Sequence, residues 1–442
     1  MNLKSGLDSL EIQIDAMERT VFYGKVVRIS GVLVEATGLK VPVGSICKIN
    51  AAHLEAGILA EVIGFSNDTT FFIAFEQPVG ILPGTPIQFI EKVFKIPVGP
   101  SLMGRVINGF GNPIDGRGLI RDSEYYPIES DPINPIQRNR IATPLDVGVR
   151  AINSLFSVGI GQRLGIFSGS GVGKSMLLGM ITRFTRADVV VVGLIGERGR
   201  EVKEFVEENI GPEHLAKTII IAAPIDTSPL ERTNGALTAV TVAEYFRDLG
   251  MNVLLIIDSL TRYAQALRQM YTLLGEPVAS KGYSPSVFAK LSQLAERCGN
   301  GIGSQGSITA FFTVLVEGDD MNDPVGDHVR SVLDGHIVLS RSLAEASHYP
   351  AIDISASISR VMTSIVDKEH NSLSMYFKKM YAHYMQNQDL IKMGMYRQGA
   401  DPLLDEAIKL IDRLQKFLQQ EYQEDASFTE SREQLEQVLV IA

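Results

Sequence analysis

Hydrophobic and polar positions follow a different rhythm in each of three stretches of the chain. In residues 1–93 the first apolar positions recur every three or four residues, at Leu3, Leu7, Leu10, Ile14, Met17 and Val21. This spacing predicts a helix with one apolar side. Short β-rich runs broken by turn residues follow, at 21–36, 41–49, 58–65 and 69–75. Because short strands at this density are typical of small closed sheets, we expect a β-barrel here.

Residues 94–366 alternate nearly continuous apolar runs with helical patterns. The runs are 163–167, 188–196, 218–224, 252–258, 307–315 and 335–340. Strands buried on both faces have this texture, so the stretch predicts an α/β domain with a mostly parallel sheet flanked by helices. Residues 367–442 read as helical. Their clearest helix, 405–423, has apolar positions at Ile408, Ile411, Leu414 and Leu418, and its charges form a solvated face.

Length and composition limit the classes of protein to consider. A chain of 442 residues exceeds one hydrophobic core, which favours two or three domains. A net charge of -10 argues against a protein that coats DNA or RNA. Cys47 and Cys298 are the only cysteines and have no metal-ligand neighbours, which indicates a reducing compartment without a zinc site. Acidic residues near the N-terminus do not suit a signal peptide, so we expect a cytoplasmic protein.

The stretch "GIFSGSGVGKSMLL" at 165–178 carries the first chemical signal. It matches the phosphate-loop pattern at Gly173, Lys174 and Ser175, although Ser168 stands where the pattern has its first glycine. Such a loop points backbone amides at phosphate oxygens, at the positive end of a helix. Lys174 would reach the β- and γ-phosphates, and the Ser175 hydroxyl would bind Mg²⁺. The nucleotide-binding residues predicted here are Gly169, Ser170, Gly171, Val172, Gly173, Lys174, Ser175 and Met176.

Two carboxylates sit where nucleotide hydrolysis needs them. Asp258 ends the apolar run 252–258, where it would hold Mg²⁺ through water. Glu197 follows the run 188–196 and would polarise the attacking water, since strand ends converge on ligands in open α/β sheets. The competing interpretations are a glycine-rich turn with an incidental lysine, and a surface Glu197 paired with Arg198 or Arg200.

With these motifs in place, the chain resembles the ATPases of type III secretion, in the branch that drives flagellar protein export, and is similar in turn to the catalytic subunits of rotary ATP synthases. The resemblance covers nearly the whole chain. The matching segments are "GERGREV" at 196–202, "LLIIDSLTRYAQA" at 254–266, and the longer stretches 132–175, 281–291, 306–341 and 348–362. The chain departs from the family pattern at Ser284 and Ser292, where prolines are usual. The fold that the resemblance implies is a small N-terminal β-barrel, a RecA-like nucleotide-binding domain and a C-terminal helical domain.

The resemblance also implies roles for single residues. Glu197 would activate water with Arg198 beside it, and Arg262 would lie near the γ-phosphate. Arg360, in "SISRV", resembles an arginine finger inserted into a neighbouring subunit's site, a role that suits a planar, permanently charged group. Tyr349, in "HYPAID", resembles the aromatic that stacks on adenine. Without the resemblance, Arg360 reads as an exposed structural arginine and Tyr349 as a packing residue.

The implied protein is a homo-hexameric Mg-ATP-hydrolysing motor that delivers or unfolds export substrates at a membrane gate. Its implied partners are export-apparatus proteins, export substrates and chaperones, and a negative regulator on the N-terminal helix. We expect it in the cytoplasm, peripherally at the inner face of the cell membrane.

The alternatives are the injectisome branch, a rotary synthase subunit and a Rho-like RNA translocase. The last would need basic residues among its aromatics, which Phe71, Phe72 and Phe75 lack.

Overall fold

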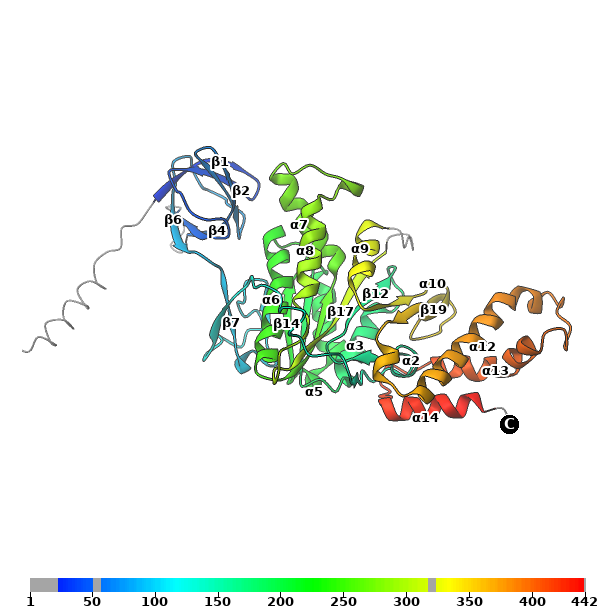
Figure 1. Cartoon of the computed structure of the whole chain (residues 1–442). Coiled ribbons are helices and arrows are strands. Elements are labelled where there is room, and N and C mark those ends of the chain that lie inside the picture. The colour runs from blue at the N-terminus through cyan, green and yellow to red at the C-terminus, as the bar shows by residue number, and fades with distance from the viewer. Residues whose placement is uncertain (1–22, 51–56, 317–322, 441–442) are drawn as a thin grey trace, which may run out of the picture. The chain divides into compact units, whose positions relative to one another are not determined.

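The structure, a computed structural model, describes residues 23–50, 57–316 and 323–440 (Figure 1). The helix predicted from Leu3 to Val21 lies outside these residues. The chain divides into two compact units, Met1–Lys95 and Ile96–Ala442. The predicted boundaries after 93 and 366 stay predictions.

The first unit is a closed six-stranded barrel, which confirms the fold predicted for it. Its strands are ordered β1-β2-β5-β4-β3-β6 around the barrel. They are β1 Tyr23–Ser30, β2 Leu33–Thr37, β3 Ile46–Ile49, β4 Ile58–Ser66, β5 Thr69–Ala74 and β6 Pro86–Glu91. Side chains such as Val34, Ile49, Phe72 and Ile87 fill the interior. The sequence pattern missed β6, because only its second residue, Ile87, is fully buried and the strand shows no clear alternation.

The second unit is built on a twisted sheet with the order β19-β18-β12-β17-β15-β13-β14-β8. The strands are β8 Val106–Asn108, β12 Arg163–Ser168, β13 Val189–Ile195, β14 Thr218–Ala223, β15 Asn252–Asp258, β17 Ser307–Leu315, β18 Gly335–Leu339 and β19 Ile352–Ser359. All six predicted runs are strands. Neighbours from β18 to β8 are parallel, whereas β19 runs antiparallel to β18. The parallel arrangement brings the ends of β12, β13 and β15 to one edge of the sheet.

Helices cover this sheet (Figure 1). Those that position the site are α3 Lys174–Phe184, α4 Gly199–Glu204, α6 Pro229–Asp248, α7 Leu260–Leu273, α8 Pro285–Glu296, α9 Pro324–Val332 and α10 Arg341–Glu345. A π-helical turn, η2 Phe205–Ile210, continues α4. The long helices α6 and α7 pack on each other, and α6 packs on β13 and β15.

The C-terminal part is helical, as predicted, with α12 Lys368–Lys392, α13 Pro402–Leu418 and α14 Phe428–Leu439 (Figure 1). The apolar face of α13 is buried at Ile411, Leu414 and Leu418 and half-buried at Ile408. Its charged face is exposed, for example at Lys409. These helices share one hydrophobic core with the sheet, since Leu414 and Phe417 belong to the same cluster as Ile166.

Candidate active site

The loop between β12 and α3 has the form that phosphate binding requires. The strand ends at Ser168 and the helix begins at Lys174. Gly171 and Gly173 have φ values of 78° and 88°, in the left-handed region that residues with a Cβ atom rarely adopt. The loop therefore leaves free amides at the positive end of α3.

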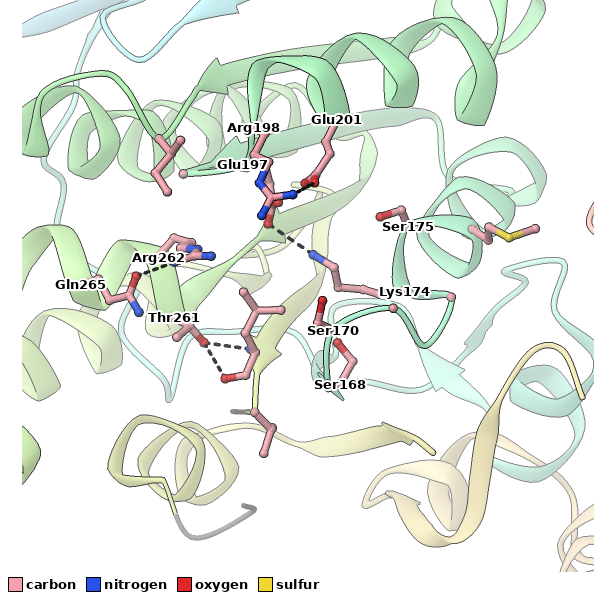
Figure 2. A pocket seen from close by; sticks show the side chains of 18 of the residues that line it. Ser168, Ser170, Lys174, Ser175, Glu197, Arg198, Glu201, Thr261, Arg262 and Gln265 are labelled. Carbon is pink, nitrogen blue, oxygen red and sulfur yellow. Dashed lines mark hydrogen bonds and ion pairs between the residues drawn. The ribbon is translucent and has the colours of Figure 1, made fainter. Parts of the chain in front are cut away.

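A cavity of about 610 Å³ opens at this loop (Figure 2). Nine of its lining residues were predicted from the sequence as site residues: Gly169, Ser170, Gly171, Gly173, Lys174, Ser175, Met176, Glu197 and Arg198. Arg262, also predicted, lines it from α7 together with Thr261 and Gln265. Figure 2 shows Lys174 and Glu197 pointing toward each other, with Arg262 facing the loop from the other side. We name this space the phosphate cavity.

Two carboxylates converge on the ammonium group of Lys174. Its Nζ lies 3.4 Å from Glu197 Oε1 and donates a shorter hydrogen bond to Asp258 Oδ1. Asp258 is only 3% exposed and also accepts a 2.6 Å bond from the Thr313 hydroxyl. Burial lowers the pKa of Lys174, but Asp258 and Glu197 raise it more, so the pKa lies above its usual value and the side chain is charged.

The environment of Glu197 is that of a proton acceptor that works near neutral pH. Burial, opposed by Lys174 and reinforced by Asp258, raises the pKa of Glu197 to about 7. Its ion-pair partner is Lys174, whereas the exposed Arg198 pairs with Glu201 at 3.4 Å. The alternative of a Glu197 paired with Arg198 is therefore wrong.

Arg262 is held against the end of β13. Its Nη1 donates a 3.0 Å hydrogen bond to Gln265 Oε1, which fixes the guanidinium along α7. A Cβ on Gly196 would lie 2.8 Å from the Cβ of Arg262, so the glycine of "GERGREV" allows this close approach.

A second cavity of about 710 Å³ adjoins the first at Gly173 and Met176. We name it the base cavity. Tyr349 lines it and is 40% exposed, so it is not a core-packing residue. A Cβ on Gly173 would lie 3.2 Å from a ring carbon of Tyr349, which places the ring against the phosphate loop.

Tyr422 also lines the base cavity, and the sequence reasoning missed it. The pattern placed it inside the predicted helix 405–423, but α13 ends at Leu418, four residues earlier. Only the folding of the C-terminal part against α3 brings it there.

Two predicted residues lie elsewhere. Val172 is buried in the core, so only its main chain belongs to the loop. Arg360 follows β19 at the opposite edge of the sheet from the loop. Arg360 lies level with Asp334, just before β18 and one residue beyond the Ser359–Gly335 pair, whereas Ser168 lies level with Leu339, one residue beyond the Phe167–Val338 pair. This offset of five residues separates Arg360 from Ser168 by about 17 Å along the strands.

Comparison with known proteins agrees with this geometry. Residues 148–359 match the nucleotide-binding domain of the ATP synthase alpha/beta family, 26–91 its beta-barrel domain, and 366–437 the C-terminal domain of the type III secretion ATPase EscN. The flagellum-specific ATP synthase of Salmonella typhimurium is 49% identical over 98% of this chain and 97% of its own. The chain belongs to the flagellar and type III secretion ATPase family.

Solved structures of the family share the fold. Assembled EscN from the enteropathogenic E. coli type III secretion system has a TM-score of 0.89 and 44% identity, over 94% of this chain and 100% of its own. EscN in complex with its central stalk EscO has a TM-score of 0.88 and 43% identity, over the same shares. The chain is therefore an ATPase with a nucleotide substrate, and EscN forms an assembly.

Residues beside the phosphate loop fit a magnesium ion, which would come with the nucleotide. Among the described residues, no three His, Cys, Asp or Glu side chains cluster as a metal site of their own. The exposed Ser175 and the buried Asp258 instead offer two oxygen donors beside the loop, and Mg²⁺ commonly takes its remaining oxygens from phosphates and water. In the described part of the chain, no helix has the length and apolar content to span a bilayer.

Proposed function

We propose that the chain is the Mg-ATP-hydrolysing motor of a flagellar type III protein export apparatus and works as a ring of six. The observation that carries this proposal is the convergence of Glu197 and Asp258 on Lys174 at the phosphate loop. The flagellar branch is favoured over the injectisome branch because the flagellum-specific relatives of Salmonella typhimurium and Pseudomonas aeruginosa are 49% and 50% identical over at least 95% of this chain. The type III secretion ATPase of Xanthomonas euvesicatoria is 44% identical over 90%.

Each group of the phosphate cavity has a task in hydrolysis. Loop amides and Lys174 bind the triphosphate oxygens, and Arg262 offsets charge on the γ-phosphate from the other side. Glu197 orients the attacking water and accepts its proton, which its raised pKa favours near neutral pH. Ser175 and Asp258 would hold Mg²⁺, whose charge neutralises the phosphates when it is bound.

Arg360 completes the site of a neighbouring subunit. The distance along the sheet keeps it from its own chain's loop. Its side chain is exposed, and its Nη1 and Nη2 donate hydrogen bonds of 3.1 and 3.3 Å to the carbonyls of Leu333 and Arg330 at the end of α9. A planar, permanently charged group that stays exposed suits the phosphates of a neighbouring site.

The base cavity takes the adenine. Tyr349 borders the loop that holds the phosphates, and Tyr422 supplies a second aromatic ring. Aromatic rings bind purines through stacking, with little need for polar readout.

The remaining assignments concern location and partners. The motor would act in the cytoplasm, peripherally at the inner face of the membrane, with export-apparatus proteins, chaperones and substrates. A negative regulator would bind the N-terminal stripe Leu3–Val21.

Phosphate release from ATP by the purified chain tests the proposal. We expect turnover with Mg²⁺, none with EDTA, and a rise in turnover per chain with protein concentration as rings form. Turnover per chain that stays constant with concentration would contradict sites shared between subunits. A large stimulation by single-stranded RNA would instead favour the translocase.

A further inference from the structure

Three segments that are far apart in sequence contact one another beside the phosphate loop. They are α3 itself, the π-helical turn η2 that continues from Glu197 through α4, and the segment around Tyr422 that lines the base cavity. π-Helical turns are rare and occur often at functional sites. Ser175 and Glu197 in these segments line the phosphate cavity, and Tyr422 lines the base cavity.

Asn209 of η2 joins the other two segments. The Tyr422 hydroxyl donates to the carbonyl of Asn209 at 3.1 Å and lies 3.4 Å from its Oδ1. The Nδ2 of Asn209 donates to the Ser175 carbonyl at 3.4 Å. The Asn209 carbonyl lies in the last turn of η2, where a helix has no internal donor for its carbonyl groups. The Tyr422 hydroxyl supplies the missing hydrogen bond.

Two further residues hold this arrangement in place. A Cβ on Gly179 of α3 would lie 3.0 Å from the Asn209 carbonyl oxygen and 3.0 Å from the Tyr422 hydroxyl, so a larger residue would press on both groups, and the glycine leaves them room. Arg183 places its guanidinium 3.9 Å from the centre of the Tyr422 ring and also donates to the Tyr422 carbonyl. The ring is therefore fixed by a cation–π contact while its hydroxyl points at η2.

We propose that Asn209 and the Tyr422 hydroxyl are positioning residues that couple base binding to the phosphate cavity. A base stacked on Tyr422 would reinforce this position of the ring, and with it the bond from the hydroxyl to η2 and, through Asn209, the contact with the Ser175 carbonyl. The helix α4 leads from η2 back to Glu197, so the same bond would steady the residue that orients water. This coupling depends on the ATP site proposed above.

The test compares variants of the full chain in steady-state ATP hydrolysis. Tyr422→Phe keeps the ring and removes the hydroxyl. Asn209→Leu keeps the volume and removes the side-chain contacts to the Tyr422 hydroxyl and the Ser175 carbonyl, while the main-chain carbonyl still accepts from Tyr422. We expect each to lower kcat about threefold to tenfold, the effect of one hydrogen bond, while KM changes less than about twofold. Because both lie on one path from the base to Ser175, the double variant should lose no more than the single variant with the larger loss.

The matched control is Tyr376→Phe, which removes a tyrosine hydroxyl bonded to Glu406 in the C-terminal helices. It should leave kcat and KM unchanged. A raised KM with unchanged kcat would make the hydroxyl a simple base contact and overturn the coupling, as would additive losses or no change. An inactive wild-type chain would instead remove the proposed function, and the coupling with it.

Discussion

The phosphate cavity and the base cavity share Gly173 and Met176, yet the chain builds them in different ways. The side chains that act at the phosphate loop follow buried parallel strands, and each lies within a few residues of a strand end. The base cavity combines four parts of the chain that are far apart in sequence: Arg150 and the segments around 173–180, 347–350 and 416–424. The catalytic side chains at the ends of the strands can therefore be found from the local sequence. The base cavity instead depends on how the C-terminal part folds against α3.

The largest effects are expected from removing the charged groups that act at the γ-phosphate, Glu197 and Arg360. Glu197→Gln should lower kcat by about 10²–10⁴-fold, because it removes the proton acceptor, and Arg360→Ala by about 10³-fold, because it removes a transition-state charge partner. Both variants should still bind ATP. Phosphate release and nucleotide binding by each purified variant measure these outcomes.

Mixing the two inactive variants distinguishes a neighbour's arginine from a chain's own. If Arg360 acts across the interface, about one quarter of the interfaces in randomly mixed rings pair an intact Glu197 with an intact Arg360. Activity should then return on mixing. A mixture no more active than its components would place both residues in one chain's site.

The next effect concerns the base cavity alone. Tyr349→Ala should raise KM for ATP about tenfold with kcat changed much less, since stacking on an aromatic contributes about 1–3 kcal/mol per base. Tyr125→Ala, at an exposed tyrosine in β9 Glu124–Pro127, serves as the control and should leave KM unchanged. A fall in kcat without a change in KM would move Tyr349 from base binding to the chemical step.

The pH dependence belongs to the phosphate cavity. The pKa of Glu197 is raised to about 7, and only its ionised form accepts a proton, so kcat/KM should fall as the pH drops through this value. At pH 6 it should be about tenfold below its plateau. The residual activity of Glu197→Gln should lack this acidic limb. A wild-type profile flat between pH 6 and 8 would contradict the assignment.

The same contrast explains what could be predicted from the sequence. The strand ends that carry Glu197 and Asp258, and the loop before Lys174, follow from apolar runs and glycine spacing, because a parallel sheet brings such ends together. Tyr422 and Asn209 gave no such signal, since their partners lie in segments that no periodicity connects. The family resemblance pointed to Arg360, and only the strand register shows that it lies far from its own loop.

The smallest effect concerns Ser168, which stands where the phosphate-loop pattern has glycine. The residue ends β12 and is absent from the positive-φ positions, so its backbone does not require glycine. Its hydroxyl is buried, and no described residue bonds it, which costs free energy in the folded state. Ser168→Ala should therefore keep kcat within about twofold and raise the melting temperature by about 1–3 °C. Ser168→Gly, which restores the pattern, should give no faster turnover and a lower melting temperature than the alanine variant, because glycine adds freedom to the unfolded chain. A gain of turnover in the glycine variant would show that the first position of the loop controls phosphate binding after all.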